Sequence, residues 1–141
     1  MAATLFLFRA TAGRCIMSQR YFTIEEANAL LPELEPLVGR LLELRARVSH
    51  DSRAVGPALA DLRSDVGGPI ASRLTGEFEQ IELLVKRIQT YGCVMKSLES
   101  GLLDFLCERD GRDVYLCWRY GEPSIQYFHE IHTGFQGRRP V

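Results

Sequence analysis

The stretch from 102 to 119 reads L-L-D-F-L-C-E-R-D-G-R-D-V-Y-L-C-W-R. On both sides of its Asp110-Gly111 pair the sequence pattern repeats with a period near two, which is the spacing of side chains on one face of a β-strand. Asp-Gly tolerates the positive φ angles of a type I′ turn, so residues 109–112 are predicted to close a β-hairpin. In the returning strand, two faces are expected: Val114, Leu116 and Trp118 on one, and Tyr115, Cys117 and Arg119 on the other.

Two further strands are predicted beside this hairpin. A short strand at 93–96 precedes it, and a fourth strand at 125–129 follows the turn at Gly121-Glu122-Pro123. Residues 92–141 therefore predict a small antiparallel β-meander.

Helical patterns precede the sheet. Thr23 and Glu26 have the spacing of a capping box, and apolar residues then recur at steps of three and four: Ala27, Leu30, Leu34, Leu37, Leu41, Leu44 and Val48. Because proline lacks a backbone N–H, Pro32 and Pro36 predict a break between a helix at 24–31 and a second helix that runs to about 49.

A connection rich in glycine and proline is expected at 50–69. The next helix has an apolar stripe and ends near Gly92; the stripe consists of Leu74, Phe78, Ile81, Val85 and Ile88. The predicted fold class is α+β, with an antiparallel helical hairpin (22–91) packed on the C-terminal β-meander (92–141). Both helical stripes exceed what a small sheet can cover, so a homodimer through the helical hairpin is also expected.

Residues 1–21 stand apart from this single domain. The apolar run from Leu5 to Phe8 is too short for a signal peptide or a membrane span. We expect either a disordered leader or a misassigned start, with Met17 as the initiator. Arg9 and Arg14 without nearby acids leave an organelle-targeting segment as a weaker alternative.

Composition narrows the class of protein. The chain has 141 residues, 46% of them hydrophobic and 25% charged, which is typical of a globular domain. Its net charge of −1 lacks the basic excess of a nucleic-acid surface, so we expect neither a nucleic-acid nor a membrane partner. The four cysteines lack a C-x-x-C spacing and are expected to be reduced, apolar side chains in a cytoplasmic protein: Cys15, Cys93, Cys107 and Cys117.

Six sections carry a family resemblance. They read F-T-I-E-E-A-N-A-L-L-P-E-L at 22–34, G-C-V-M-K at 92–96, G-L-L-D-F at 101–105, L-C-W-R-Y-G-E at 116–122, F-H at 128–129 and G-F-Q-G-R at 134–138. In these the chain resembles a family of small, mainly bacterial proteins known as domain of unknown function 2203. The resemblance implies no activity, but it singles out candidate ligand-binding residues: Lys96, Asp104, Trp118, Glu122, His129 and Arg138.

The leading interpretation is a cytoplasmic module that binds a small molecule or a protein through a polar and aromatic site on this sheet, with no cofactor. Within that site, Glu122 either orients His129 for acid–base work or binds the amides of its own turn. Asp104 lies among apolar neighbours and needs a partner, for which Lys96, Arg119 and Arg138 are the candidates.

The alternative function is a small metal-dependent hydrolase. Its divalent ion would be held by His129, His132 and Glu122, with Asp104 or Glu130 as further carboxylates. Residues three apart on a strand point to opposite faces, so His129 and His132 converge only if a turn follows Phe128.

Overall fold

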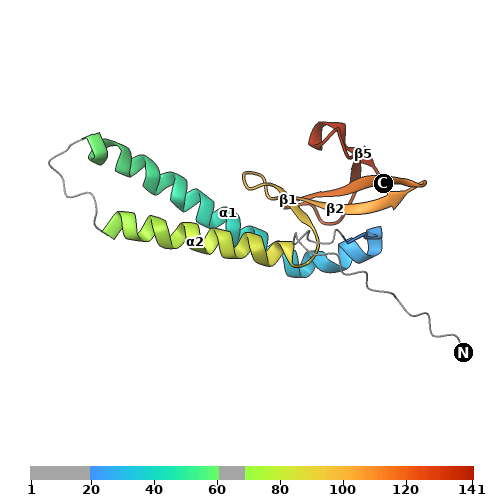
Figure 1. The fold of residues 1–141 in the computed structure, drawn as a ribbon, viewed down its shortest axis with the longest axis horizontal. Coiled ribbons are helices and arrows are strands. Elements are labelled where there is room, and N and C mark those ends of the chain that lie inside the picture. The colour runs from blue at the N-terminus through green and yellow to red at the C-terminus, as the bar shows by residue number, and fades with distance from the viewer. Residues whose placement is uncertain (1–19, 61–68) are drawn as a thin grey trace, which may run out of the picture.

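The computed structural model describes residues 20–60 and 69–141. In this part of the chain, two helices precede a five-stranded antiparallel sheet of order β1-β2-β3-β4-β5 (Figure 1). The elements are α1 (Ile24–Ala60), α2 (Pro69–Gln89), β1 (Val94–Ser97), β2 (Leu102–Arg109), β3 (Arg112–Arg119), β4 (Tyr127–Glu130), the 3-10 helix η1 (Phe135–Gly137) and β5 (Arg139–Pro140). The predicted α+β class is confirmed. The expected leader falls almost entirely outside the described residues.

The start of α1 is held by the predicted capping box. Thr23 Oγ1 accepts a hydrogen bond from the Glu26 N–H at 3.1 Å, and Glu26 Oε2 accepts one from the Thr23 N–H at 3.0 Å. Just before it, the Phe22 N–H donates to the Leu106 carbonyl at 2.7 Å. The helix is thereby attached to β2 at its first turn.

The predicted break at Pro32 and Pro36 is wrong, because α1 continues through both residues. Each proline removes one helical hydrogen bond, but both proline rings are exposed and lie away from the core. Leu31, Leu34 and Val38 on the opposite side are buried. Burial of these three side chains contributes more free energy to the continuous helix than the loss of two hydrogen bonds removes.

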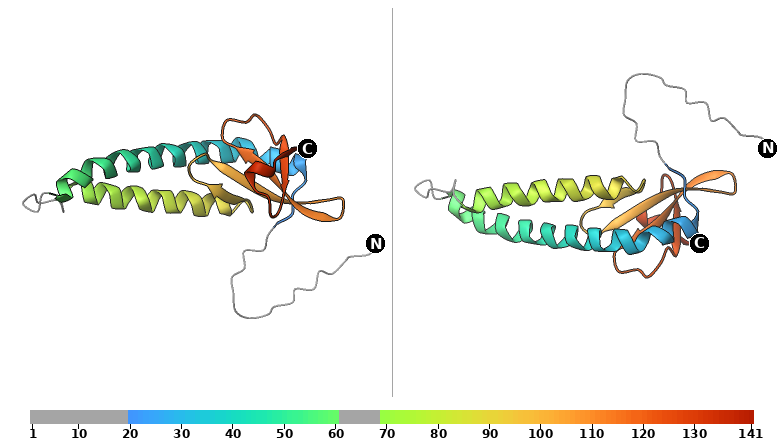
Figure 2. Two further views of the ribbon diagram at one scale, coloured as in Figure 1. Left: turned by 90° about the horizontal axis from the view of Figure 1, so that it is seen from above. Right: turned by 90° about the horizontal axis from the view of Figure 1, so that it is seen from below.

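The two helices form an arm that reaches beyond the sheet (Figures 1 and 2). Helix α1 runs to Ala60 and α2 starts at Pro69, so helix occupies most of the expected connection at 50–69. The buried stripe of α2 also differs from the prediction. Phe78 is 56% exposed, whereas Glu77 is buried and its Oε1 lies 3.5 Å from Arg47 Nε on α1. The side of α2 that faces α1 therefore carries the ion-pairing Glu77 in place of the phenyl ring.

The central hairpin has the predicted register. Arg109 pairs with Arg112, and the intervening Asp110 and Gly111 have φ angles of 53° and 72°. These positive values are those of a type I′ turn, which matches the twist of the flanking strands. Strand β5 was not expected; its residues pair with Tyr127 and Phe128 of β4.

Both faces of the sheet bury side chains. One face packs on the helices, and its apolar side chains belong to the core: Leu103, Phe105, Cys107, Val114, Leu116 and Trp118. We call the opposite side the outer face; η1 lies on this side, away from the helices (Figure 1). Its buried side chains include Asp104, Tyr115, Cys117 and His129. Neither α1 nor α2 has a stretch apolar and long enough to span a membrane, as judged over the described residues.

Candidate functional site

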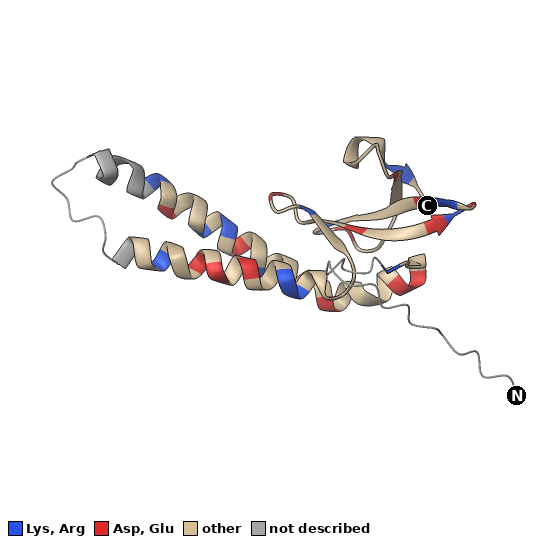
Figure 3. Ribbon diagram, viewed as in Figure 1, with Lys and Arg blue, Asp and Glu red and all other residues tan. Residues whose placement is uncertain are grey.

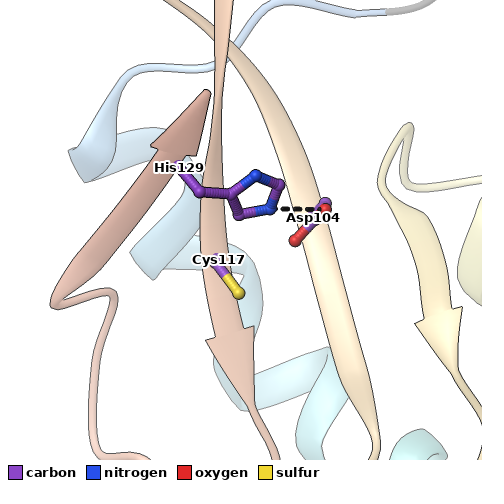
Figure 4. A group of neighbouring side chains, drawn as sticks. All are labelled: Asp104, Cys117 and His129. Atoms are coloured by element: carbon purple, nitrogen blue, oxygen red, sulfur yellow. Dashed lines mark hydrogen bonds and ion pairs between the residues drawn. The ribbon is translucent and has the colours of Figure 1, made fainter. Parts of the chain in front are cut away.

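A buried acid–imidazole pair lies at the centre of the outer face (Figure 4). His129 Nε2 on β4 is 2.9 Å from Asp104 Oδ2 on β2, and the two side chains are 2% and 1% exposed. Between them runs β3, whose Cys117 is the register partner of Asp104. Strand pairing thus brings together two ionisable groups that are 25 residues apart in the chain.

The hydrogen bonds of His129 restrict where its protons reside. Nδ1 lies 2.8 Å from the Glu130 carbonyl, which only accepts, so Nδ1 carries a hydrogen. One further proton then lies between Nε2 and Asp104 Oδ2, either on the ring or on the carboxyl group. Both arrangements are neutral as a pair, which lowers the cost of burial. Burial raises the pKa of Asp104, and the nearby imidazole lowers it only in part.

A third metal-binding side chain adjoins this pair. The Cys117 sulfur, the His129 ring nitrogen and an Asp104 oxygen all lie within 4.8 Å of one another. Burial, together with the charge of Asp104, raises the pKa of Cys117 to about 12, so the sulfur is a thiol. Asp104 Oδ1 is buried and finds no hydrogen-bond partner within residues 20–60 and 69–141.

Beside this group lies an ion pair between Glu122 and Arg138. Arg138 Nη1 and Nη2 donate to the two carboxylate oxygens at 2.8 and 2.7 Å, and the Arg119 N–H donates to Oε2 at 2.8 Å. Burial alone raises the pKa of Glu122, but these hydrogen bonds outweigh it and hold the pKa below its usual value. Arg138 Nη2 also donates to the Cys117 carbonyl at 3.1 Å, which joins the two clusters.

The candidate residues therefore form two adjacent pairs instead of one site. Asp104 contacts His129, and not the expected Lys96, Arg119 or Arg138. Glu122 does not orient His129. It binds an amide of its own turn, as one of the two alternatives foresaw, and it also binds Arg138.

Trp118 and His132 lie away from the acid–imidazole pair, whereas Lys96 is near enough for its charge to offset part of the effect of burial on the pKa of Asp104. Trp118 is fully buried on the helix-facing side, where its Nε1 donates to the Glu122 carbonyl at 2.8 Å. Lys96 is exposed on β1, with its Nζ 4.8 Å from the centroid of the Tyr115 ring. His132 is exposed and lies outside the group of converging metal-ligand atoms. Whether any of these residues binds a ligand stays a prediction.

Cys117 is the residue that sequence reasoning did not select. A two-residue turn at Asp110-Gly111 pairs residues whose numbers sum to 221, and Asp104 and Cys117 satisfy this sum. The predicted hairpin therefore already placed Cys117 opposite Asp104. The three described cysteines, Cys93, Cys107 and Cys117, are free and buried, as expected.

Comparison with known protein families assigns the chain. The model of a family described as "Uncharacterized conserved protein (DUF2203)" matches residues 20–141. The chain belongs to this family. No curated protein and no solved structure matches it. The DUF2203 match covers both helices and the entire sheet, so the two polar clusters lie within it.

Proposed function

We propose that this DUF2203 protein is a non-enzymatic module that binds a protein partner through an arginine–aromatic patch on its C-terminal sheet. The patch consists of Arg119, Tyr127, Phe135 and Arg138. The observation that carries the proposal is the position of Arg138, whose guanidinium carbon is 4.3 Å from the Tyr127 ring centroid and 4.8 Å from that of Phe135. Such distances are typical of cation–π contacts.

The chemistry of the patch favours a partner segment with acidic and apolar side chains. Arginine and aromatic residues are enriched where proteins bind one another. Phe135 is 38% exposed, and the exposed Arg119 lies 5.8 Å from its ring centroid. Glu122 pairs with the largely buried Arg138, so Arg119 supplies the exposed positive charge of the patch. The bidentate pair with Glu122 also holds Arg138 in place before binding, which reduces the entropy lost on association.

A random peptide library displayed on phage tests this surface. We expect enriched peptides that combine Asp or Glu with apolar residues, and at least tenfold weaker binding to the Arg119→Ser and Phe135→Ser variants. Ile131→Ser and Arg112→Ser are matched controls, because both residues are exposed and outside the patch. Failure to enrich any sequence, or equal losses in the controls, would contradict the proposal.

The hydrolase alternative has less support from the geometry. Asp104 and His129 are closed off from solvent, so a substrate has no route to them in this conformation. Glu122 is engaged by Arg138, and His132 is exposed elsewhere. A hydrolytic site needs an accessible ion and water, and this arrangement favours the binding module.

We further propose that the helical arm forms a homodimer. Leu74, Phe78, Ile81 and Val85 recur at steps of four, three and four, yet Phe78 is 56% exposed and the other three are only partly buried. Beyond the sheet, each helix of the arm packs only on the other within the described chain (Figure 2). A second copy would convert this two-helix layer into a four-helix bundle.

Charge along α2 favours an antiparallel second copy. Acidic Glu79 and Glu82 precede basic Lys86 and Arg87, so reversed copies bring opposite charges together (Figure 3). Light scattering should return twice the chain mass for the wild type and the single mass for Phe78→Glu. Gln80→Glu adds the same charge on another side of α2 and should stay dimeric. A wild type that is monomeric at micromolar concentration contradicts the homodimer.

A further inference from the structure

We propose that Asp104, Cys117 and His129 bind a zinc ion on the outer face of the sheet. This inference does not depend on the arginine–aromatic patch, and it uses a different ligand set from that expected from the sequence. The three side chains come from β2, β3 and β4 and converge in Figure 4. Thiolate, imidazole and carboxylate are the three ligand types that zinc takes in proteins.

The spacing of the donor atoms suits this ion. Ligand atoms of a tetrahedral zinc site lie roughly 3.3–3.6 Å apart, given bond lengths of about 2.0–2.3 Å. In the protein all three donors lie within 4.8 Å of one another, and His129 Nε2 is 2.9 Å from Asp104 Oδ2. Side-chain movements of less than about 1 Å would therefore create the site, with no change in the strand pairing.

The surroundings of His129 match those of a metal ligand. Histidines that bind metals usually donate their other ring N–H to a carbonyl or carboxylate, which fixes the tautomer and the ring orientation. His129 does so through Nδ1 to the Glu130 carbonyl at 2.8 Å, and this leaves Nε2 directed at Asp104. The backbone of Cys117 is held in turn by the hydrogen bond from Arg138 Nη2 to its carbonyl.

The unpartnered oxygen of Asp104 supplies an independent reason for an ion. A buried carboxylate oxygen without a hydrogen bond costs free energy, and native proteins seldom tolerate one. Among the residues that the structure describes, Asp104 Oδ1 forms no hydrogen bond of ordinary geometry, and besides His129 the carboxyl group has only the weak thiol donor of Cys117 beside it. A bound cation would interact with it, and a carboxylate that binds through both oxygens would add a fourth donor to the sulfur and the imidazole in a distorted tetrahedral arrangement.

Charge balance also favours a divalent ion. On binding, the Cys117 thiol loses its proton, and the proton shared by Asp104 and His129 also leaves to solvent. One thiolate and one carboxylate then neutralise the ion, so the occupied site has no net charge. All three ligands are at most 2% exposed, so the ion would be closed off from solvent and would have a structural role. The ion would crosslink three neighbouring strands.

The first test measures metal in the wild-type protein, produced without a histidine tag. We expect about one zinc ion per chain by plasma mass spectrometry. Zinc added to chelator-treated protein in hundredfold excess over its Kd should raise the melting temperature by about 5–10 °C. Protein that unfolds cooperatively but contains no zinc and is not stabilised by added zinc would overturn the proposal.

The second test identifies the ligands. Cobalt(II) added to the chelator-treated protein should produce the near-ultraviolet charge-transfer absorption of a cobalt–thiolate bond. The absorption should disappear in Cys117→Ser and persist in Cys107→Ser, whose free thiol belongs to the helix-facing core. Absorption that survives in Cys117→Ser would overturn the assignment. If that variant does not fold, X-ray absorption of the zinc-loaded wild type identifies the ligands instead. The proposal requires a sulfur atom at about 2.3 Å from the zinc ion.

Discussion

Both faces of the central hairpin bury side chains, but the two faces differ in chemistry. The helix-facing side consists of apolar groups such as Phe105, Leu116 and Trp118, whereas the outer face buries Asp104 and His129. An apolar face is what folding requires, because its burial is the main favourable contribution to stability. A buried acid and imidazole add little stability compared with apolar residues of the same volume. The outer face is therefore where a selected function is expected.

The largest effect is expected on the helix-facing side. Phe105→Ala should lower the free energy of unfolding by about 3–5 kcal/mol, since it leaves a cavity in the core. Phe105 is fully buried and makes an edge contact with Phe22 at a centroid distance of 5.3 Å. Urea unfolding followed by circular dichroism measures the change. A loss below about 1 kcal/mol would show that this face is less tightly packed than the structure indicates.

Breaking the outer pair comes next. His129→Leu leaves Asp104 buried without its partner and should lower the free energy of unfolding by about 3 kcal/mol. This is the low end of the range for broken buried pairs, because burial raises the pKa of Asp104 and the carboxyl group can become protonated. Measurements with a chelator present exclude any contribution from metal. His132→Leu is the control, with an expected change of at most about 0.5 kcal/mol because its side chain is exposed. Equal effects of the two substitutions would mean that the buried pair has no special role.

A smaller, pH-dependent effect is expected at the ion pair of Glu122. The pKa of Glu122 is lower in the folded state than in the unfolded chain. The ion pair therefore contributes its full stabilisation above the unfolded pKa of about 4.3, and this stabilisation is lost as the pH falls through the folded-state pKa. Glu122→Gln should cost about 1–2 kcal/mol at pH 7 and much less near pH 2. Unfolding curves at both pH values measure this difference. A cost that does not vary with pH would show that the stabilisation comes from side-chain packing and not from charge.

The smallest effect is expected when both polar partners are replaced together. Asp104→Leu with His129→Leu removes the pair without leaving a buried charge, so its stability should lie within about 1 kcal/mol of the wild type. The single variants and the double variant form a thermodynamic cycle that isolates the interaction. A double variant as unstable as His129→Leu alone would show that the outer face depends on the pair for its structure.

Local patterns predicted much of the fold. The capping box at Thr23 and Glu26 and the turn at Asp110-Gly111 are formed as expected, because both depend on residues within a few positions of one another. The alternation in β3 correctly separated Trp118 from Cys117. The position of Phe78 could not be predicted in this way, since its exposure depends on how α2 is rotated against α1.

The candidate site shows the same division. Its residues were recognisable as ionisable groups among apolar neighbours, but their pairing depends on the register of β4, which no tight turn sets. The segment 120–126 between β3 and β4 allows several registers, and only packing selects one.

The amino-acid sequence alone determined the class of fold, the central hairpin and the part of the chain that carries polar side chains, because these follow from spacing over a few residues. The tertiary structure alone decided that α1 passes through two prolines, that Asp104 meets His129, and that Cys117 joins them. Those outcomes depend on contacts between distant residues, whose free energies exceed the local preferences that oppose them.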